Sequence, residues 1–274
     1  LVGAKVAIVT PKVHTTRTRL LGIGVGADSQ IVFIDTPGIF MPRRRLDRAM
    51  VGAAWSGVAD GDIVVLVIDA VRGLSGQVKA IIERLAASKR RCVVALNKID
   101  ALKAREQLLA LAQAVEQQLA PEQLFMISAL DGDGVTDLKT WLAQAMPEGP
   151  WLYPEDQLSD VTQRLMAAEI TREKLYLQLH QELPYAVTVE TESWSAHKDG
   201  SARIEQVIFV ERASQKGIVI GKGGRQLKDI GAAARADMEA AFGCRVHLFL
   251  FVKVDPHWSE SRERYGAMGL DWTE

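Results

Sequence analysis

Residues 62–98 read DIVVLVIDAVRGLSGQVKAIIERLAASKRRCVVALNK, and this stretch decides the fold class. The nearly continuous apolar runs at 62–70 and 91–98 are typical of strands that are covered on both faces. The segment between them, 75–88, has the apolar spacing of a helix. Strand, helix and strand in this order predict a βαβ unit with parallel strands.

The same alternation extends outward from this unit in both directions. Further strands are expected at 6–10, 30–36 and 124–128, and further helices at 46–58, 102–119 and 135–146. Residues 1–146 are therefore predicted to form a doubly wound α/β domain. A proline-rich linker at 147–158 follows, and 159–274 are predicted to form a second domain with the order α-β-β-α-α-β. Its elements are expected at 161–181, 185–194, 203–212, 225–243 and 245–254, with a short helical piece before 225.

Composition excludes several classes of protein. The 274 residues include 33 Lys and Arg against 34 Asp and Glu, so the net charge of −1 excludes binding of polyanions by overall charge but not by a local patch. Two cysteines, Cys92 and Cys244, are too few for a disulfide framework or a zinc cluster. The longest apolar runs have the length of strands and are too short to span a membrane.

A candidate phosphate-side motif follows the predicted strand at 30–36. It consists of Asp35, Thr36, Pro37 and Gly38. A carboxylate at the end of such a strand can hold Mg²⁺, usually through water, and a glycine lets its backbone N–H approach a γ-phosphate. By itself this motif is equally compatible with a simple turn built on proline and glycine.

A candidate guanine-binding motif follows the next long strand. The Asp100 carboxylate can accept hydrogen bonds from N1–H and the 2-amino group of guanine, which adenine cannot donate. Asn97 can bridge loops around the base, and the stem of Lys98 can lie along the ring. After the following strand, Ser128 and Ala129 place a backbone N–H where it can reach the guanine O6. Three motifs at successive strand ends predict a nucleotide site along one edge of one sheet.

These motifs resemble the GTP-binding domain of the P-loop GTPase superfamily. That superfamily needs a loop of the form G-x-x-x-x-G-K-[ST], and the 274 residues contain none. Residues 1–5 resemble the end of the helix that follows such a loop, so the loop is expected ahead of Leu1. The sequence as given is expected to bind nucleotide poorly and to show no GTP hydrolysis; a natural pseudo-GTPase is the alternative.

The resemblance implies further roles. The Thr15-Thr16-Arg17 stretch corresponds to the first switch segment, in which Thr16 is expected to ligate Mg²⁺ together with Asp35, unless the stretch is only a solvated basic turn. Gly38 belongs to the second switch. Ile39 stands where related enzymes carry a glutamine that orients the attacking water, so slow intrinsic hydrolysis is expected.

A second candidate site lies around the sequence GKGG at 221–224. A G-x-x-G loop lets backbone N–H groups approach a nucleic-acid phosphate, and KH domains use it to hold single strands. Residues 212–235 carry six basic side chains against Asp229 alone, whereas 151–274 as a whole carry 15 basic and 19 acidic ones. The candidate RNA-binding residues are Lys216, Ile220, Gly221, Lys222, Gly223, Gly224, Arg225 and Lys228. A flexible turn is the alternative for the loop, and Ile218, Val219, Ile220 and Ile230 are suited equally to a groove and to the core.

A GTP-binding domain, a proline-rich linker and a type II KH domain together resemble the Era family of ribosome-assembly GTPases. The resemblance extends to residues 154–156, 169–174 and 182–185. It implies GTP or GDP with Mg²⁺ in the first domain and the 3′ region of 16S ribosomal RNA on the second, during assembly of the small (30S) ribosomal subunit. It also implies a cytoplasmic protein without an obligate oligomer, and it allows a peripheral association with the inner membrane. Two alternatives stay open: a nucleotide-independent RNA-binding scaffold, and a relative of the double-GTPase proteins with a KH-like tail.

Overall fold

The N-terminal part of the chain is built around the expected βαβ unit. The computed structural model describes residues 1–12, 15–26, 28–102, 104–180 and 183–272. Strand β3 (Val64–Asp69) and strand β4 (Cys92–Asn97) pair in parallel, with helix α2 (Gly76–Ser88) between them along the chain. Strand β5 (Gln123–Ile127) adds in parallel to the other side of β4. The central strand β4 is almost wholly buried, as its apolar sequence predicted.

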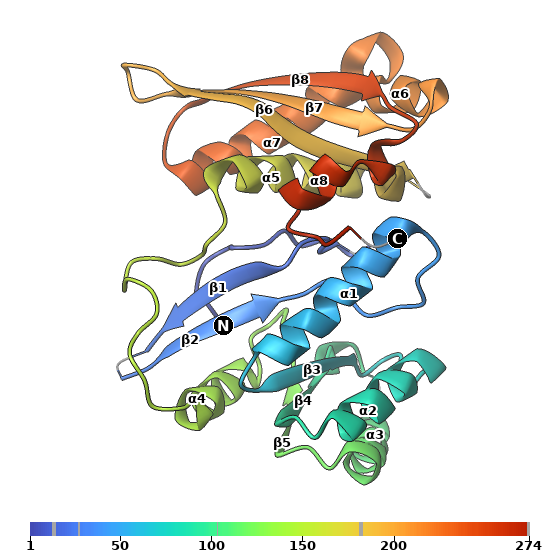
Figure 1. Ribbon diagram of the computed structural model, residues 1–274, viewed down its shortest axis with the longest axis vertical. Helices are drawn as coiled ribbons and strands as arrows, with labels where there is room; N and C mark the ends of the chain where they lie inside the picture. Colours follow the sequence, from blue (N-terminus) through green and yellow to red (C-terminus); the bar gives the residue numbers. More distant parts are fainter. Residues whose placement is uncertain (13–14, 27, 103, 181–182, 273–274) are drawn as a thin grey trace.

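Helices cover this parallel sheet. Those of the N-terminal part, besides α2, are α1 (Arg45–Asp60), the short 3-10 helix η1 (Ile99–Ala101), α3 (Arg105–Leu119) and α4 (Val135–Ala145). One apolar cluster joins Ile82 of α2 and Val115 of α3 to Val94 and Leu96. The strand directions and the helical layers confirm the predicted α/β class (Figure 1).

A separate two-stranded sheet corrects the prediction of one continuous sheet. Strand β2 (Gln30–Asp35) pairs antiparallel with β1 (Leu20–Val25), a strand that was not predicted. Among the described residues no ladder joins β2 to β3; instead Ile31 packs in one cluster with Val93 of β4. Residues 6–10, expected as a strand, have no strand structure, because the Val9 N–H donates to the carboxylate of Glu173 at 2.8 Å rather than to a neighbouring strand.

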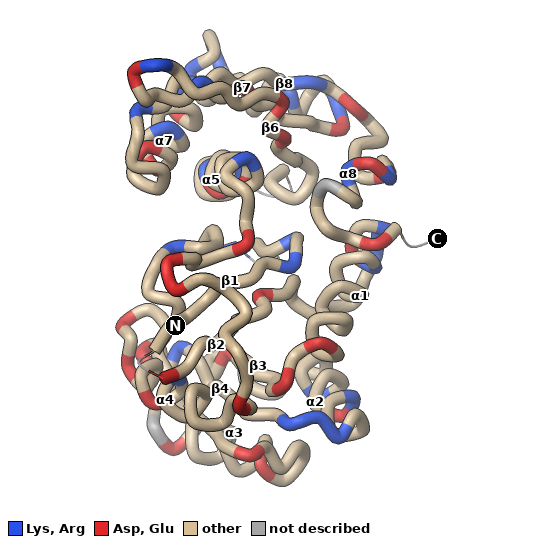
Figure 2. Tube along the Cα trace, turned by 60° about the vertical axis from the view of Figure 1, so that its left-hand side comes forward, with Lys and Arg blue, Asp and Glu red and all other residues tan. Residues whose placement is uncertain are grey.

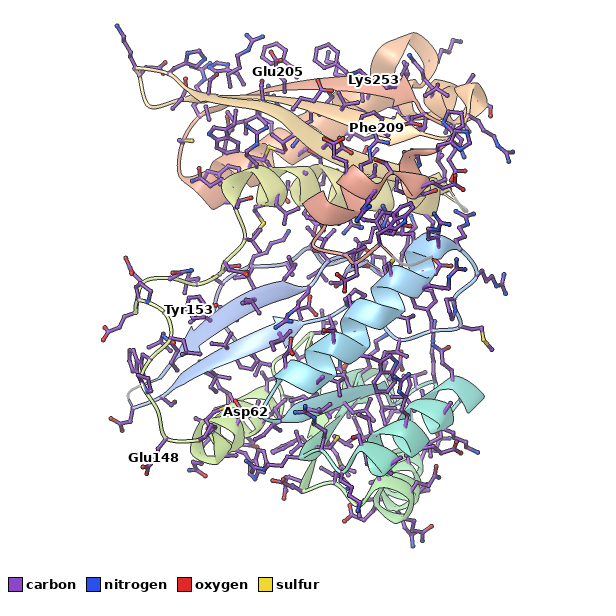
Figure 3. All side chains as sticks on the ribbon, in the orientation of Figure 1. Asp62, Glu148, Tyr153, Glu205, Phe209 and Lys253 are labelled. Atoms are coloured by element: carbon purple, nitrogen blue, oxygen red, sulfur yellow. The ribbon has the colours of Figure 1, made fainter. Side chains whose placement is uncertain are left out.

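The proline-rich connection is attached to β1 along part of its length. The Ile23 N–H donates to the Leu158 carbonyl at 2.8 Å, and Gln30 accepts from the N–H of Tyr153 at 3.0 Å. Figure 3 shows Tyr153 on this connection beside β1 and β2. The segment therefore follows the small sheet before it enters the second part of the chain.

The second part has the predicted order α-β-β-α-α-β. Its main elements are α5 (Gln163–Gln178), β6 (Val187–Ala196), β7 (Ala202–Val210), α6 (Ala213–Ile220), α7 (Arg225–Phe242) and β8 (Val246–Val254). Short 3-10 helices η2 (Leu183–Ala186), η3 (Lys222–Gly224) and η4 (Trp258–Glu260) and helix α8 (Arg262–Ala267) complete it. The sheet order is β6-β7-β8, with β6 antiparallel and β8 parallel to β7. Helices α5, α6 and α7 pack on one face through an apolar cluster that includes Leu175, Val219 and Ile230.

The two parts share an apolar interface formed by α1 and the C-terminal segment. Leu46 and Met50 of α1 pack in one cluster with Trp258, Tyr265 and Leu270. The same cluster includes Val207 and Phe209 on the face of β7 that α5 and α7 do not cover. Figure 1 shows α8 between the second sheet and α1. Burial of this apolar area stabilises the observed placement of one part on the other.

Gly134 fixes the turn between β5 and α4, and we expect its replacement by alanine to destabilise the protein. Its φ is +67°, and an added Cβ would lie 2.3 Å from the Met126 carbonyl oxygen. Strain together with a backbone clash should lower the free energy of unfolding by about 2 kcal/mol or more, measured by urea denaturation. The matched control is Gly132→Ala, which has φ +87° but no atom within 4 Å of the new Cβ. Equal losses for the two variants would exclude the clash as the cause.

Candidate functional site

Asn97 connects the two loops that the sequence assigned to the base. Its Oδ1 accepts hydrogen bonds from the Lys98 N–H at 2.8 Å and from the Ala129 N–H at 2.9 Å. The end of β4 and the loop after β5 are thereby held together, which is the bridging role predicted for this side chain. The same bond occupies the Ala129 N–H that was expected to reach guanine O6, so a bound base would have to share or displace it.

Lys98 contacts a residue that the sequence analysis missed. Its Nζ lies 2.7 Å from Oδ2 of Asp69, which ends the neighbouring strand β3. The Asp69 carboxylate also accepts from the N–H groups of Val71 and Arg72. Partial burial opposes ionisation, but the hydrogen bond from Lys98 and these N–H groups outweigh it and lower the pKa of Asp69. An ionised Asp69 fixes the lysine stem at the edge of the site.

Ser128 and Asp100 have contrasting environments. Ser128 is 1% exposed; its N–H donates to the Asp133 carbonyl, and its Oγ accepts from the Asp131 N–H at 3.2 Å, so it shapes the loop. Asp100 lies in η1 and is exposed. Within the described parts of the chain its carboxylate has no hydrogen-bonding or ionic partner, which leaves both oxygens free for a ligand that donates two hydrogen bonds.

Thr16 and Asp35 lie side by side. The Thr16 hydroxyl donates to Oδ2 of Asp35 at 3.3 Å. The hydroxyl of Thr15 points elsewhere, to Thr10 at 2.7 Å and to the Lys12 carbonyl at 2.9 Å, which favours Thr16 over Thr15 as a ligand. Asp35 is exposed at the end of β2, yet surrounding protein excludes enough water from its carboxyl group to raise its pKa, against the opposing hydrogen bonds from Thr16 and from the N–H of Thr36.

This pair fits a magnesium ion. A carboxylate and a hydroxyl are oxygen ligands of the kind Mg²⁺ prefers, and Mg²⁺ commonly takes only one or two protein ligands besides phosphate and water. In the described residues there is no group of three or more His, Cys, Asp or Glu side chains suited to a metal. Thr16 and Asp35 would thus hold the ion together with the nucleotide, and the ion would neutralise charge on the phosphates.

The remaining residues after β2, at 36–39, form an irregular segment rather than the simple turn that the sequence left open as an alternative. Thr36 packs against α1 so closely that a Cβ on Gly57 would lie 2.5 Å from its methyl group. Pro37 is buried, and Gly38 is exposed with open space around its Cα. The Ile39 carbonyl accepts from the side chain of Gln77 on α2. Ile39 offers no side-chain group that could orient water, and slow hydrolysis stays a prediction.

The GKGG sequence forms a tight link between α6 and α7. Gly221 has φ +72°, and a Cβ there would lie 2.6 Å from the Cβ of Gln226, so only glycine fits. Gly223 and Gly224 also have positive φ, at +62° and +79°, but a Cβ on either meets no atom within 4 Å. Helix α7 begins at Arg225 without a side-chain cap. The Arg225 N–H donates to the Lys222 carbonyl, and the N–H groups that follow it at the helix start lie next to this loop, where an anion is favoured.

Unpaired cations surround the loop. Lys222, Arg225 and Lys228 are exposed, and Lys216 is half-buried. Among the described residues none of the four forms an ion pair. Figure 2 shows acidic and basic residues intermixed along both parts of the chain. Free cations beside an uncapped helix start form a surface that can accept phosphate groups.

The sequence left two roles open for the apolar residues around the loop, which are packing in the core and forming a groove for bases. The structure divides the residues between these roles. Val219 and Ile230 are fully buried and belong to the core. Ile218 is 57% exposed, whereas Ile220 is half-buried against the core. Of the four, Ile218 has the side chain most available to a bound base.

Two family matches cover most of the chain. Residues 6–148 match the elongation factor Tu GTP binding domain family, and residues 182–259 match the KH domain family. In the described parts of the chain, no helix is long and apolar enough to cross a membrane.

Whole-chain relatives have the same two parts. The chain is 56% identical over 272 residues to the GTPase Era of Rhizobium meliloti (strain 1021), covering 99% of this chain and 87% of that protein. It is 57% identical over 272 residues to the GTPase Era of Afipia carboxidovorans, covering 99% and 88%. It is 54% identical over 277 residues to the GTPase Era of Dinoroseobacter shibae, covering 100% and 90%.

Two solved structures are similar over nearly the whole chain. One is Era in complex with MgGDPNP and nucleotides 1506–1542 of 16S ribosomal RNA, at a TM-score of 0.93 and 34% identity, covering 97% of this chain and 91% of that one. The other is a variant of Aquifex aeolicus Era bound to GDP·AlF4⁻, at a TM-score of 0.92 and 34% identity with the same coverage.

Proposed function

Since the chain belongs to the Era family of GTPases, we propose that it couples GTP binding and hydrolysis to the binding of 16S ribosomal RNA during small-subunit assembly. The observation that carries this proposal is the likeness, over 97% of the chain, to a structure that contains both MgGDPNP and a 16S rRNA segment. We assign residues 1–146 to the GTP-binding domain, 147–158 to the linker and 159–274 to the KH domain. The family matches at 6–148 and 182–259 support this division.

In the first domain, Asn97, Lys98 and Asp100 select the base. The free carboxylate of Asp100 accepts from guanine N1–H and its 2-amino group, while Asn97 holds the loop that carries Ala129. A base without these donors would leave the carboxylate unpaired, which costs binding free energy. Thr16 and Asp35, which lie 3.3 Å apart, would hold Mg²⁺ at the phosphate side, and the backbone N–H of Gly38 would be available to a phosphate.

In the second domain, the GKGG loop and its cations bind the 3′ region of the RNA. Lys222, Arg225 and Lys228 are exposed and available to phosphates, and residues Lys216 and Ile220 border the loop on α6. Loops of this form hold about four nucleotides of single strand. The protein would act in the cytoplasm, where this substrate is assembled. The family resemblance alone, and no described residue, suggests a peripheral association with the inner membrane.

RNA affinity measured in two nucleotide states tests this function. Because the 274 residues contain no G-x-x-x-x-G-K-[ST] sequence, the protein is also prepared with such a segment ahead of Leu1, here named the extended protein. We expect the extended protein to hydrolyse GTP slowly and to bind an RNA of the 16S 3′ region with an affinity that differs between GDPNP and GDP. A scrambled RNA of the same length is the control. We expect the 274-residue chain to show no turnover.

Two results would contradict the proposal. Equal affinity for the 16S and scrambled RNAs would exclude specific recognition of the 3′ region. Equal RNA affinity with GDPNP and with GDP would exclude nucleotide coupling and favour the alternative, a nucleotide-independent RNA-binding scaffold.

A further inference from the structure

The short segment Thr15–Arg17 contacts both domains at once. Its middle residue, Thr16, donates to the Asp35 carboxylate at 3.3 Å in the nucleotide-binding domain. Its two neighbours contact the KH domain: the Thr15 carbonyl accepts from Nη2 of Arg172 at 2.6 Å, and the Arg17 guanidinium enters the space between α5 and β6. The proposed magnesium ligand is thus flanked on both sides by attachments to the RNA-binding domain.

Arg17 is anchored by several groups at once. The side chain is buried, and the residue is 5% exposed. Nη1 donates to the Val187 carbonyl at 2.8 Å, while Nη2 donates to the Tyr176 hydroxyl at 3.1 Å and to the Tyr185 carbonyl at 3.3 Å. The guanidinium carbon lies 5.9 Å from the centre of the Tyr176 ring and 5.6 Å from that of Trp258. All these partners belong to the KH domain as assigned here, residues 159–274.

The charge of Arg17 makes this anchor sensitive to displacement. Among the described residues it forms no ion pair with a carboxylate, although the residue is buried. A buried charge that loses its hydrogen-bonding partners without reaching water is strongly unfavourable. The side chain is therefore stable either fully inserted or fully withdrawn, which is the behaviour of an element with two states.

Two buried polar atoms beside the segment lack partners in this arrangement. In the described parts of the chain, the Thr18 Oγ1 and Arg172 Nη1 atoms are buried and form no hydrogen bond. The rest of the Arg172 guanidinium is held by the Glu169 carboxylate and the Thr15 carbonyl. An unpaired buried donor costs free energy. A shift of the segment that gave these two atoms partners would offset part of the cost of breaking the hydrogen bond between Arg172 and the Thr15 carbonyl.

The backbone transmits any movement of Thr16 to its neighbours. Consecutive Cα atoms are about 3.8 Å apart, so Thr16 cannot move by more than a small distance without carrying Thr15 and Arg17. A nucleotide that draws the Thr16 hydroxyl toward a metal ion at Asp35 must therefore pull on the contacts with Val187, Tyr176 and Arg172, or release them.

We propose that Arg17 is the positioning residue that couples the occupancy of the nucleotide site to the placement of the KH domain. This inference rests on the proposed function and adds the residue through which the coupling acts. In one nucleotide state the guanidinium holds the KH domain in the observed arrangement. In the other, movement of Thr16 withdraws it and releases α5 and β6.

The experiment measures a coupling factor in the extended protein, defined as the ratio of RNA dissociation constants with GDP and with GDPNP. For the unmodified protein we expect a factor that differs from one by about 5- to 150-fold. Arg17→Ala should bring it to within about twofold of one. The factor by which RNA changes the GDPNP-to-GDP affinity ratio must fall by the same amount, because coupling between two binding sites is reciprocal. A variant that only loses stability would weaken RNA binding in both nucleotide states and would leave the coupling factor unchanged.

Arg19 provides the matched control. Arg19 lies two residues beyond Arg17 in the chain and pairs with Asp60 of α1, inside the nucleotide-binding domain. Arg19→Ala removes the same charge and should leave the coupling factor within twofold of that of the unmodified protein. Arg17→Lys keeps the charge but loses the planar fork that reaches both Val187 and Tyr176, so its factor should also fall toward one.

An unchanged coupling factor in Arg17→Ala would overturn this inference while leaving the proposed function intact. If Arg17→Ala does not fold, as judged by its melting temperature, Arg17→Lys decides in the same way: an unchanged factor overturns the inference, and a factor near one supports it. A factor of one in the unmodified extended protein would overturn the inference and the nucleotide coupling in the proposed function together. An equal loss in Arg19→Ala would also overturn it, because the effect would not require contact with the KH domain.

Discussion

Asp100→Asn in the extended protein should reverse the preference between guanine and xanthine nucleotides. The exposed Asp100 carboxylate is free to accept from guanine N1–H and the 2-amino group. An asparagine amide loses one of these acceptors and presents a donor to the amino group, whereas xanthine carries a carbonyl at that position. The loss for GTP should be on the order of 2–4 kcal/mol, as for one partner of a charged hydrogen bond in a desolvated site. XTP binding should become stronger, and competition titration measures both.

Asp137→Asn is the control for this substitution. Asp137 is also exposed and lies in the first turn of α4, after the loop that carries Ser128. It makes the same change of charge on the same domain, and nucleotide selectivity should not respond. If Asp100→Asn also left the preference for GTP over XTP unchanged, Asp100 would not contact the base.

The second large effect is expected from replacing Lys222 and Gly223 together with Asp. The change places two carboxylates where a phosphate should lie, so RNA affinity should fall at least tenfold, or about 1.4 kcal/mol. Gly223 has φ +62° and open space around a new Cβ, and Asp tolerates this conformation better than most residues. The melting temperature should therefore change little, and a binding titration with single-stranded RNA measures the loss.

A matched double substitution exists in the same domain. Lys198 and Gly200 lie in the exposed loop between β6 and β7, and Gly200 likewise has positive φ, +81°, with no atom within 4 Å of a new Cβ. Replacing both with Asp changes the net charge by the same amount. RNA affinity should fall much less, by no more than the change in overall charge requires. An equal fall in the two double variants would show that the GKGG loop has no special role.

Apolar patterning predicted the strands of the parallel sheet and β2 well, but it missed β1. Strands β3, β4 and β5 have continuous apolar sequences, and their observed bounds lie close to the predicted ones. Strand β1, with the sequence LLGIGV, contains two glycines that disfavour a strand, and it forms only because β2 and the connection at 158–159 pair with it. Pairing of this kind depends on residues that are distant in the sequence.

The expected strand at 6–10 shows the converse error. Ile8 is buried, as its apolar surroundings indicated, but the neighbouring Val9 is 74% exposed. Its backbone is held by a side chain instead of a strand, since the Val9 N–H donates to Glu173. Burial of Glu173 alone would raise its pKa, but this N–H together with Lys5 and Lys174 leaves the pKa below its usual value. An apolar sequence cannot distinguish these two ways of being buried.

The residues of the candidate site were likewise predicted only in part from the sequence. Motif spacing placed Asn97, Asp100 and Ser128 at strand ends, where the structure has them. The role of Asp69 could not be predicted, because its contact with Lys98 depends on the register that sets Asp69 opposite Asn97. The burial of Arg17 was equally inaccessible: within its polar stretch it looks solvated, and only the contact between the two domains buries it.

The cluster between α1 and the C-terminal segment has a consequence for the order of events during synthesis. Leu46 packs in one cluster with Trp258, but Trp258 follows it by 212 positions in the chain and is synthesised later. At roughly 5–20 residues per second, the interval before this partner leaves the ribosome is about 10–40 s. During that time the apolar side chains of α1 lack their final cover. The nascent N-terminal domain therefore exposes this apolar face of α1 until the C-terminal segment has been synthesised, a period in which a chaperone would compete with premature self-association.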